Sequence, residues 1–483
     1  IKCLMINNKR YYMDPYEQFD VQIKNAAEEF KKIDKKDVIR VISHLDADGI
    51  SACAIMIKLL NNDNRKYSIS IVQQLNKGVL SQLASEPYNC FIFTDIGSGV
   101  ISEIKEMLNG KNIFVLDHHS ISDDDFSGVV FVNPHICSID GGKEISGAGV
   151  VLKFACAVDK TMEELAHIAI VGAIGDLQEQ NGFSRLNDEI LKIAVEKGKI
   201  KVIKGLRIFG AQTKPLHKAL EYCTDPYIPG VSGSESGAIQ FLYQIGIEPK
   251  NGNEWKKMVH LAEEEMKKLV TGIIMKRINE AQPDDVLGNV YILPYEEEES
   301  PTRDAKEFAT LLNACGRLGR ASFGIGACLG DKKIKQQAIR TLSDYKKEIV
   351  NALNWYNENK FSYDVFWGNK FVIINAKENV MSTMIGTLAS ILSKSNLMTN
   401  NNFILSMARA LDGNTKVSLR TTNNLGVLDL KKIIGEMIYG IGNSEAGGHQ
   451  NAAGAVIPTE KEEMFIEAAK EVLGKYSIEE RVN

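Results

Sequence analysis

Short runs rich in β-branched residues alternate with helical stretches between residues 37 and 180. Five of these runs have the length and composition of buried strands, at residues 38–43, 68–72, 90–94, 112–116 and 129–132. Helical apolar spacing is found between them, at residues 50–60, 100–108 and 147–158. This rhythm predicts an α/β fold with a doubly wound, mostly parallel sheet.

Acidic or histidine-containing clusters directly follow the first, third and fourth of these predicted strands. They read SHLDADG at residues 43–49, FTDIG at 93–97 and VLDHHS at 115–120. A fourth cluster, GAIGD at residues 172–176, closes a predicted helix. Ligands bind at the carboxyl ends of strands in such sheets, so loops distant in sequence meet there. We therefore expect the four clusters to form one site.

The side chains in these clusters are oxygen and imidazole ligands. If the extended conformation continues beyond the first strand, Asp46 and Asp48 point to the same side and can face one or two divalent cations. Gly49 would let the backbone turn tightly into the next helix. A mixed oxygen and imidazole set suits Mn²⁺, and Mg²⁺ less well, while the lack of thiolates disfavours structural zinc. A lone aspartate at a strand end is more often a cap or turn residue, so the prediction depends on the four clusters together.

Composition excludes several classes of protein. A chain of 483 residues is long enough for two or three domains. A net charge of -5 argues against a protein that coats nucleic acid, so any such contact is local. The eight cysteines contain no C-x-x-C pair and predict reduced thiols in a cytoplasmic protein. No apolar run approaches the roughly 20 residues of a membrane span. The start at Ile1 rather than Met suggests a trimmed or processed chain.

The predicted secondary structure changes twice after the first α/β region. Long charged helices are predicted at residues 253–280, 303–315 and 331–360. A second α/β pattern follows, with strands at residues 371–374, 403–407, 416–419 and 453–457 and a glycine-rich turn at 441–450. These changes predict four segments: an N-terminal extension (1–36), a catalytic domain with its linker (37–213), a mainly helical insertion (214–364) and a smaller α/β domain (365–483).

The four clusters resemble, in order, the motifs of the DHH phosphoesterases, which are named after a sequence like Asp117-His118-His119. Asn133-Pro134 and residues 146–149 (SGAG) are similar to the segment that joins the last two motifs in RecJ-type members. Residues 447–454 (GGHQNAAG) resemble the signature of the DHH-associated substrate-binding domain, DHHA1. The helical insertion and residues 312–320 (LNACGRLGR) are most similar to archaeal RecJ proteins, relatives of the Cdc-type replication factor.

This resemblance implies a role for each clustered residue. It gives His44 and Asp46 to one metal ion and Asp48, His118 and Asp176 to a second, with Asp95 bridging the two. Asp117 would orient His118, and His119 would act as a donor beside the scissile phosphate.

The implied substrate contacts lie further along the chain, at Ser146, Arg317, Arg420, Gly447, Gly448 and His449. Without the resemblance, Arg420 reads as a surface residue of an edge strand, and the glycines as turn residues. Arg317 and Arg320 either line a channel for the strand or pair with carboxylates at a helix end.

The resemblance implies a two-metal phosphodiesterase, a RecJ-like exonuclease that hydrolyses single-stranded DNA or RNA from an end to mononucleotides in replication or repair. Mn²⁺ is the expected metal, with Mg²⁺ as the second choice, because paired cations activate water and hold charged phosphate oxygens. GINS-like or helicase proteins are the implied partners of the insertion, and no membrane is involved. Two alternatives stay open: a phosphodiesterase for short oligonucleotides or cyclic dinucleotides, and a non-catalytic replication scaffold.

Overall fold

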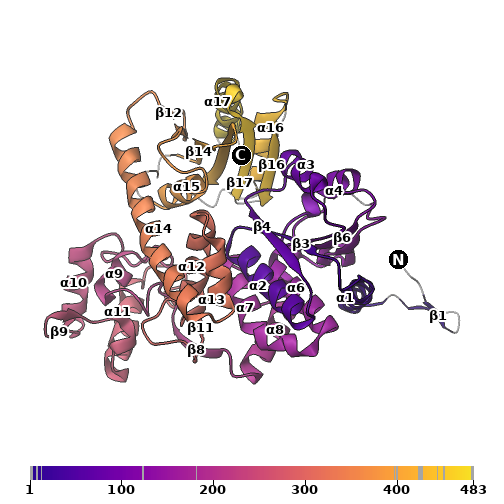
Figure 1. Cartoon of the computed structure of the whole chain (residues 1–483). Helices are drawn as coiled ribbons and strands as arrows, with labels where there is room; N and C mark the ends of the chain where they lie inside the picture. Colours follow the sequence, from indigo (N-terminus) through magenta and orange to yellow (C-terminus); the bar gives the residue numbers. More distant parts are fainter. Residues whose placement is uncertain are drawn as a thin grey trace. The chain divides into compact units, whose positions relative to one another are not determined.

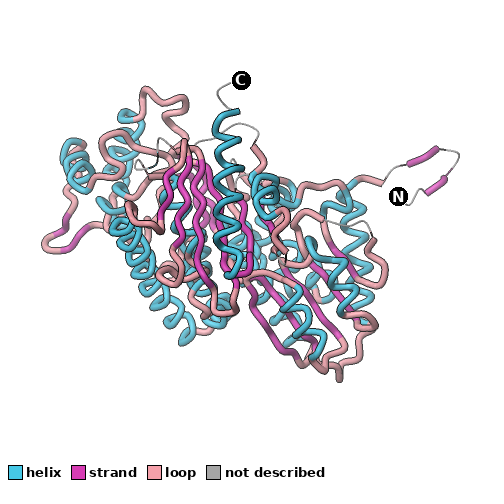
Figure 2. Tube along the Cα trace, turned by 90° about the horizontal axis from the view of Figure 1, so that it is seen from above, coloured by secondary structure: helices cyan, strands magenta, loops and turns pink. Residues whose placement is uncertain are grey.

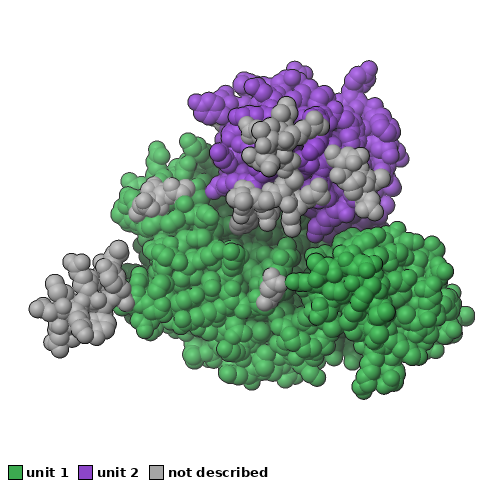
Figure 3. Space-filling view, turned by 180° about the vertical axis from the view of Figure 1, so that it is seen from behind, with its two compact units in different colours: residues 1–341 green, residues 342–483 purple. Residues whose placement is uncertain are grey.

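The computed structural model describes residues 4–6, 9–11, 13–121, 125–180, 182–395, 398, 401–422, 428–442, 444–449 and 452–479. At residues 4–6, 9–11, 445, 448, 449, 478 and 479 it describes the backbone alone. The chain forms two compact units, residues 1–341 and 342–483 (Figure 3). The division falls within the long helix α14 (Lys332–Asn359).

The first unit contains a five-stranded parallel sheet with the strand order β4-β3-β5-β6-β7 (Figure 1). Its strands are β3 (Ile39–His44), β4 (Tyr67–Val72), β5 (Cys90–Thr94), β6 (Asn112–Leu116) and β7 (Val130–Val132). Every residue of β5 is buried, as expected of a strand covered on both faces. The predicted α/β class and parallel sheet are confirmed.

One face of this sheet is covered by α3 (Lys77–Ser85) and α4 (Ile101–Met107). Their apolar residues form a continuous core with strand residues such as Phe93 and Val115. Neighbouring residues of a strand point to opposite faces, so Phe114 must pack on the other side of the sheet.

On that other face, Phe114 meets helices α1 (Pro15–Lys31) and α6 (Gly147–Val158). Its ring makes edge-to-face contacts with Phe30 of α1 and Phe154 of α6, at centroid distances of 6.2 and 6.5 Å. Helix α1 lies in the predicted N-terminal extension, but its apolar stripe is part of the core of this domain.

Helix α2 (Ala47–Asn62) is buried along most of its length and is surrounded by other helices. It packs against α6, α7 (Ala166–Gly175), α12 (Ala305–Arg317) and α13 (Ala321–Cys328). The contact with α12 is close: a Cβ atom on Gly316 would lie only 1.6 Å from the carbonyl oxygen of Leu45. Helices α12 and α13 fall within the predicted insertion, yet they belong to the helical layer around α2.

Strands β8 (Lys201–Leu206) and β11 (Leu287–Ile292) pair as an antiparallel ribbon. The part of the chain that connects them forms a separate helical module. It has its own apolar core and consists of α9 (Leu216–Glu221), α10 (Glu235–Gln244), the hairpin β9–β10 (Lys250–Asn251, Glu254–Trp255) and α11 (Glu263–Lys276). The predicted helix over residues 253–280 is therefore wrong at its start. Three glutamates in the first turn of α11 favour helix initiation there, and Trp255, in strand β10, contacts the ring of His217 at a tilted angle.

The second unit contains a six-stranded mixed sheet with the order β12-β13-β14-β15-β17-β16. Figure 2 shows its strands in magenta, with helices packed against them. The strands are β12 (Val365–Trp367), β13 (Phe371–Asn375), β14 (Phe403–Arg409), β15 (Asn414–Thr421), β16 (Glu445–His449) and β17 (Ala452–Pro458). The helices are α15 (Ile385–Ser393), α16 (Leu430–Ile438) and α17 (Glu462–Glu479). The predicted smaller α/β domain is thus present.

The glycine-rich segment at residues 441–450 differs from its prediction as a turn. Its second half forms strand β16, in which Gly447 pairs with Gly454 of β17. Pairing with β17 supplies hydrogen-bond partners for the backbone N–H and C=O groups, which glycines, having no side chains, cannot supply. No helix of the described residues is long and apolar enough to cross a membrane.

Candidate metal centre

Strand β3 ends in His44, and helix α2 begins three residues later. Asp46 is the N-cap of α2, and its Oδ1 accepts a hydrogen bond from the backbone N–H of Gly49 at 3.0 Å. The extended conformation continues through Asp46 but not to Asp48, because the helix starts at Ala47. Gly49 is needed for a close approach, since a Cβ there would lie 2.3 Å from the carbonyl oxygen of His44.

Asp48 lies in the first turn of α2 and is fully buried. Its carboxylate accepts hydrogen bonds from the backbone N–H groups of Gly147 and Ala148, at 2.6 and 3.1 Å. These two donors form the N-terminus of α6, which Ser146 caps through its hydroxyl. Ser146 is itself fully buried, so the prediction that it contacts substrate does not agree with its place in the structure; its hydroxyl serves α6.

Asp95 follows β5 with a left-handed backbone conformation (φ 58°) and is 1% exposed. Gly147 makes room for it, because a Cβ there would lie 2.4 Å from Asp95 Oδ1. Neither carboxylate oxygen of Asp95 accepts a hydrogen bond from the part of the chain that the structure describes. Buried carboxylate oxygens without donors are costly, and a bound cation would satisfy them.

His118 faces three of the acidic side chains. Its Nε2 lies 3.3 Å from both Asp95 Oδ1 and Asp176 Oδ2, and 3.7 Å from Asp48 Oδ2. Its Nδ1 lies 2.9 Å from the carbonyl oxygen of Gly141, to which it can only donate. In the neutral ring, Nε2 therefore carries the lone pair that a metal ion requires.

Asp117 orients a different histidine from the one predicted. Its Oδ1 accepts a hydrogen bond from Nδ1 of His119 at 2.8 Å, and the ring of His118 is held by Gly141 instead. Asp117 contacts His118 only through the backbone N–H. The predicted role of Asp117 toward the His118 ring is corrected accordingly.

The clustered side chains fall into three groups whose ligand atoms lie within 4.8 Å of one another. These groups are His44, Asp46 and Asp95; Asp48, His118 and Asp176; and Asp95, Asp117, His118 and His119. The structure thus brings together all eight residues of the four sequence clusters. Asp95 belongs to two of the groups, and the donor set of carboxylates and imidazoles fits divalent cations such as Mn²⁺.

Crowding of these acids shifts their ionisation. Burial raises the pKa of Asp48 to about 7, and the charge of Asp176 adds to the effect. Burial and the charge of Asp48 raise the pKa of Asp95 well above its usual value. Burial opposes ionisation of His118, but the nearby carboxylates of Asp176 and Asp95 outweigh burial and raise the pKa of His118. Without a cation the site therefore retains protons, and a divalent cation would displace them.

The pKa of Asp46 is shifted in the opposite direction. Burial would raise its pKa, but the nearby His44 and the N–H of Gly49 outweigh burial and hold the pKa below its usual range. Asp46 and His44 Nδ1 are 2.9 Å apart. The carboxylate of Asp46 is therefore kept anionic on the side of the site that contains His44.

The predicted substrate residues Arg317 and Arg420 belong to different units. Arg317 ends α12 in the first unit, and Arg320 Nη1 lies 3.4 Å from Thr341 Oγ1. Arg420 is on β15 in the second unit, where its guanidinium donates to Ser390 Oγ and to the carbonyl of Leu419.

The glycine-histidine signature is described only in part. Gly447 and the backbones of Gly448 and His449 are in β16, while the side chain of His449 lies outside the described residues.

Two polar residues near the site escaped the sequence argument. Gln178 is buried and donates to the carbonyl oxygen of Gly141, the same atom that holds His118. Asn313 of α12 accepts a hydrogen bond from the backbone N–H of Ala47 at 3.1 Å, which ties α12 to the loop containing Asp46. Neither residue has a sequence pattern that marks it, because each acts through a backbone group remote in sequence.

Three family models match the chain. The model of the DHH family, N-terminal domain, matches residues 38–174, the DHH-CID domain matches residues 208–290, and the DHHA1 domain matches residues 368–475. The first range contains the first three clusters and ends just before Asp176.

Two curated relatives are similar in sequence. An uncharacterized protein of Methanocaldococcus jannaschii is 32% identical over 444 residues, which are 90% of this chain and 93% of the relative. The single-stranded-DNA-specific exonuclease RecJ of Bacillus subtilis is 25% identical over 185 residues, which are 36% of this chain and 23% of that protein.

Solved structures share the fold. RecJ of Thermus thermophilus in complex with Mn²⁺ matches 94% of this chain with a TM-score of 0.56 and 17% identity, and this chain spans 55% of that one. Cdc45 of Entamoeba histolytica matches 95% of this chain and 99% of its own, with a TM-score of 0.62 and 10% identity.

The parallel sheet and the carboxylate and imidazole cluster beyond its strands define an α/β protein of the phosphoesterase type. The chain belongs to the DHH family, as a RecJ-like member with DHH, DHH-CID and DHHA1 domains. The resemblance inferred from the sequence is confirmed at this level.

Proposed function

We propose that the chain is a two-metal phosphodiesterase that removes mononucleotides from an end of single-stranded DNA or RNA, in replication or repair. The observation that carries the proposal is the position of Asp95, which belongs both to a group with His44 and Asp46 and to a group with His118. A carboxylate shared by two ligand groups is suited to bridge two cations.

In this proposal the chain's own residues divide into two sets. His44, Asp46 and Asp95 hold one cation, and Asp48, Asp95, His118 and Asp176 hold the other. When bound, such a pair of cations lowers the pKa of water and stabilises charge on phosphate oxygens. The N-terminus of α6 keeps Asp48 in place, and the carbonyl of Gly141 keeps Nε2 of His118 directed at the acids.

His119 is the residue proposed to meet the phosphate. Its side chain is 36% exposed, and its Nδ1 donates to Asp117. In the protonated ring Nε2–H is a second donor, and we propose that this N–H meets a phosphate or leaving-group oxygen. Arg317, Arg420, Gly447, Gly448 and His449 are proposed to contact phosphates farther along the strand. GINS-like or helicase proteins stay proposed partners, and Mn²⁺ stays the proposed metal with Mg²⁺ as the second choice.

Sequence similarity to a single-stranded-DNA-specific exonuclease supports the choice of substrate over a short oligonucleotide or a cyclic dinucleotide. The scaffold alternative has the likeness to Cdc45 in its favour, which is a likeness of fold. The intact ligand groups favour the enzyme, because a scaffold has no need of buried, crowded carboxylates.

The test is a time course with Mn²⁺ on single-stranded DNA and RNA oligonucleotides labelled at the 5′ or the 3′ end. Release of labelled mononucleotide first from one end supports the exonuclease and fixes its polarity. Asp95→Ala is compared with the control Asp188→Asn, a half-buried aspartate of α8 (Arg185–Glu196) that pairs with Lys192. Cleavage of cyclic dinucleotides alone would favour the phosphodiesterase alternative, and metal binding without any cleavage would favour the scaffold.

A further inference from the structure

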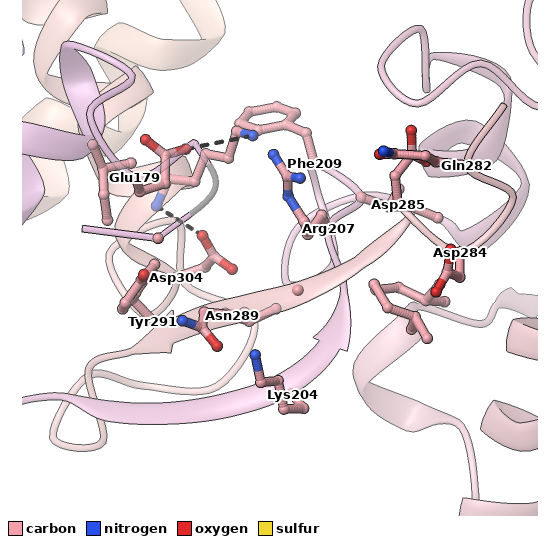
Figure 4. Close-up of a pocket in the computed structure, with 18 residues that line it drawn as sticks. Glu179, Lys204, Arg207, Phe209, Gln282, Asp284, Asp285, Asn289, Tyr291 and Asp304 are labelled. Atoms are coloured by element: carbon pink, nitrogen blue, oxygen red, sulfur yellow. Dashed lines mark hydrogen bonds and ion pairs between the residues drawn. The ribbon is translucent and has the colours of Figure 1, made fainter. Parts of the chain in front are cut away.

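A cavity of about 550 Å³ lies in the first unit, beside the segment that follows Asp176 (Figure 4). Its lining comes from the end of α7 and the following turn, from the ribbon β8–β11 with the residues just after β8 and just before β11, and from the start of α12. None of the eight clustered residues is among the described residues that line it. Pockets of about 300–1,000 Å³ are the size that holds small-molecule ligands.

Glu179 gives this cavity a buried acceptor. Its side chain is 9% exposed, and its Oε1 lies 3.9 Å from Nζ of Lys306. Its Oε2 accepts no hydrogen bond from any residue that the structure describes. Burial also raises the pKa of Glu179. A buried carboxylate oxygen without a donor is rare in a folded protein, and a ligand N–H would satisfy it.

Arg207 gives the cavity a cation. No described residue forms a hydrogen bond or ion pair with its guanidinium. Its stem lies across Gly288, where a Cβ would be 2.4 Å from Arg207 Cδ. Figure 4 shows Glu179, Arg207 and Phe209 turned toward the same space. Lys204 also lines the cavity. The site therefore offers cations and an aromatic ring near a buried acceptor. Three more carboxylates line it, of Asp284, Asp285 and Asp304; Asp285 pairs with Arg277 and Asp304 caps α12.

We propose that this cavity binds a nucleoside monophosphate, with the phosphate at Arg207 and Lys204, the base near Phe209, and base N–H groups donating to Glu179. An inorganic anion alone would leave Glu179 unsatisfied and negatively charged beside it. Guanine suits Glu179 because its N1–H and N2–H donors share one edge. The choice of ligand rests on the proposed function, whose products are nucleoside monophosphates.

The test is calorimetric titration of the full chain in EDTA, so that the metal centre takes no part. The probes are GMP and ribose 5-phosphate, which lacks the base. Arg207→Ala should weaken both probes by about tenfold or more, because it removes a charge-assisted hydrogen bond. Glu179→Gln should weaken GMP by about tenfold and leave ribose 5-phosphate unchanged. Lys201→Ala, at an exposed position of β8 outside the cavity, is the matched control and should change neither affinity.

The inference is overturned if millimolar GMP does not bind, or if Arg207→Ala and Glu179→Gln both bind GMP like the parent chain. Equal affinity for GMP and ribose 5-phosphate would leave only an anion site, which also overturns it. Hydrolysis of DNA with Mn²⁺ is measured separately on the same proteins. Hydrolysis without GMP binding in EDTA would defeat this inference alone, and GMP binding without hydrolysis would defeat the proposed function alone.

Discussion

Nδ1 of His119 donates to Oδ1 of Asp117 at 2.8 Å, and this carboxylate also accepts hydrogen bonds from the backbone N–H groups of Ser98 and His118. Burial opposes ionisation of Asp117, but the charge and hydrogen bond of His119 outweigh burial and keep the pKa of Asp117 low. Asp117 therefore stays anionic and fixes the tautomer and direction of the His119 ring.

Asp117→Asn should lower kcat for single-stranded DNA by about 10²- to 10⁴-fold, the range that a misoriented acid or base costs. The affinity for Mn²⁺ should change little, because Asp117 lies behind His119 in the proposed arrangement. Steady-state kinetics and metal titration measure the two effects. Asp140→Asn, an exposed cap of helix α5 (Gly141–Glu144), is the control. An unchanged kcat in Asp117→Asn would contradict the role of His119.

Asp95→Asn should abolish hydrolysis and also change stability in a way that depends on metal. In EDTA the variant should melt no lower than the parent chain, because burial and the charge of Asp48 raise the pKa of Asp95 and so disfavour a charged carboxylate in the metal-free site. With Mn²⁺ at about 100 times its Kd, the parent chain should gain about 2.7 kcal/mol and the variant should gain nothing. Thermal unfolding with and without Mn²⁺ measures both effects. The idea fails if Mn²⁺ stabilises the variant as much as the parent.

The pH dependence of stability can be tested at Glu307, away from the metal centre. Glu307 of α12 is 2% exposed, and burial raises its pKa to about 6. The folded chain therefore holds the proton more tightly than the unfolded chain does. This contribution to stability is complete below the unfolded pKa and is lost as the pH rises through about 6.

Glu307→Gln keeps a neutral group at this position at every pH. The variant should therefore not show the loss of stability with rising pH, which is about 2 kcal/mol for the raised pKa of Glu307. The free energy of unfolding, measured by urea at pH 4.5 and 7, should fall less in the variant than in the parent chain. Glu196→Gln, at an exposed position of α8, is the control and should keep the parental pH dependence. A steeper fall in Glu307→Gln would contradict burial as the cause.

The sequence was sufficient for the parallel sheet and for the meeting of the four clusters. Buried strands of β-branched residues and the rule that strand ends share one edge are local and general facts. Side-chain directions depended on details that the sequence does not contain. The start of α2 at Ala47 turned Asp48 toward the N-terminus of α6, and the carbonyl of Gly141 took the place that Asp117 was expected to have beside His118.

Domain limits were harder to infer than the site. Helix α12 has the same charged, amphipathic pattern as the module between β8 and β11, yet it packs on α2. An amphipathic pattern indicates that one face of a helix is exposed, but it does not indicate which element covers the apolar face. The predicted limits at residues 36, 213 and 364 stay predictions.

Ser146→Ala tests whether Ser146 acts on substrate or on helix α6. Loss of the cap should cost about 1 kcal/mol of stability and lower kcat through Asp48, with little change in KM. Ser184 is the matched control, because it is the N-cap of α8 but makes no side-chain cap hydrogen bond. Ser184→Ala should leave both stability and kcat close to the parental values. A rise in KM alone for Ser146→Ala would instead favour direct contact with substrate.

Gly316→Ala tests whether α12 is part of the structure that supports the metal centre. The added methyl group would lie 1.6 Å from the carbonyl oxygen of Leu45, so α12 or the loop before Asp46 has to move. We expect a loss of about 1–3 kcal/mol in the free energy of unfolding, the usual cost of overpacking, together with weaker Mn²⁺ binding.

Gly435→Ala in α16 is the matched control, since a Cβ there meets nothing within 4 Å. Replacing this helical glycine should stabilise the chain by about 0.5–1 kcal/mol and leave Mn²⁺ affinity unchanged. Urea unfolding and metal titration of the two variants measure the contrast. If Gly316→Ala unfolds at a lower urea concentration but binds Mn²⁺ like the parent chain, α12 stabilises the fold without positioning Asp46.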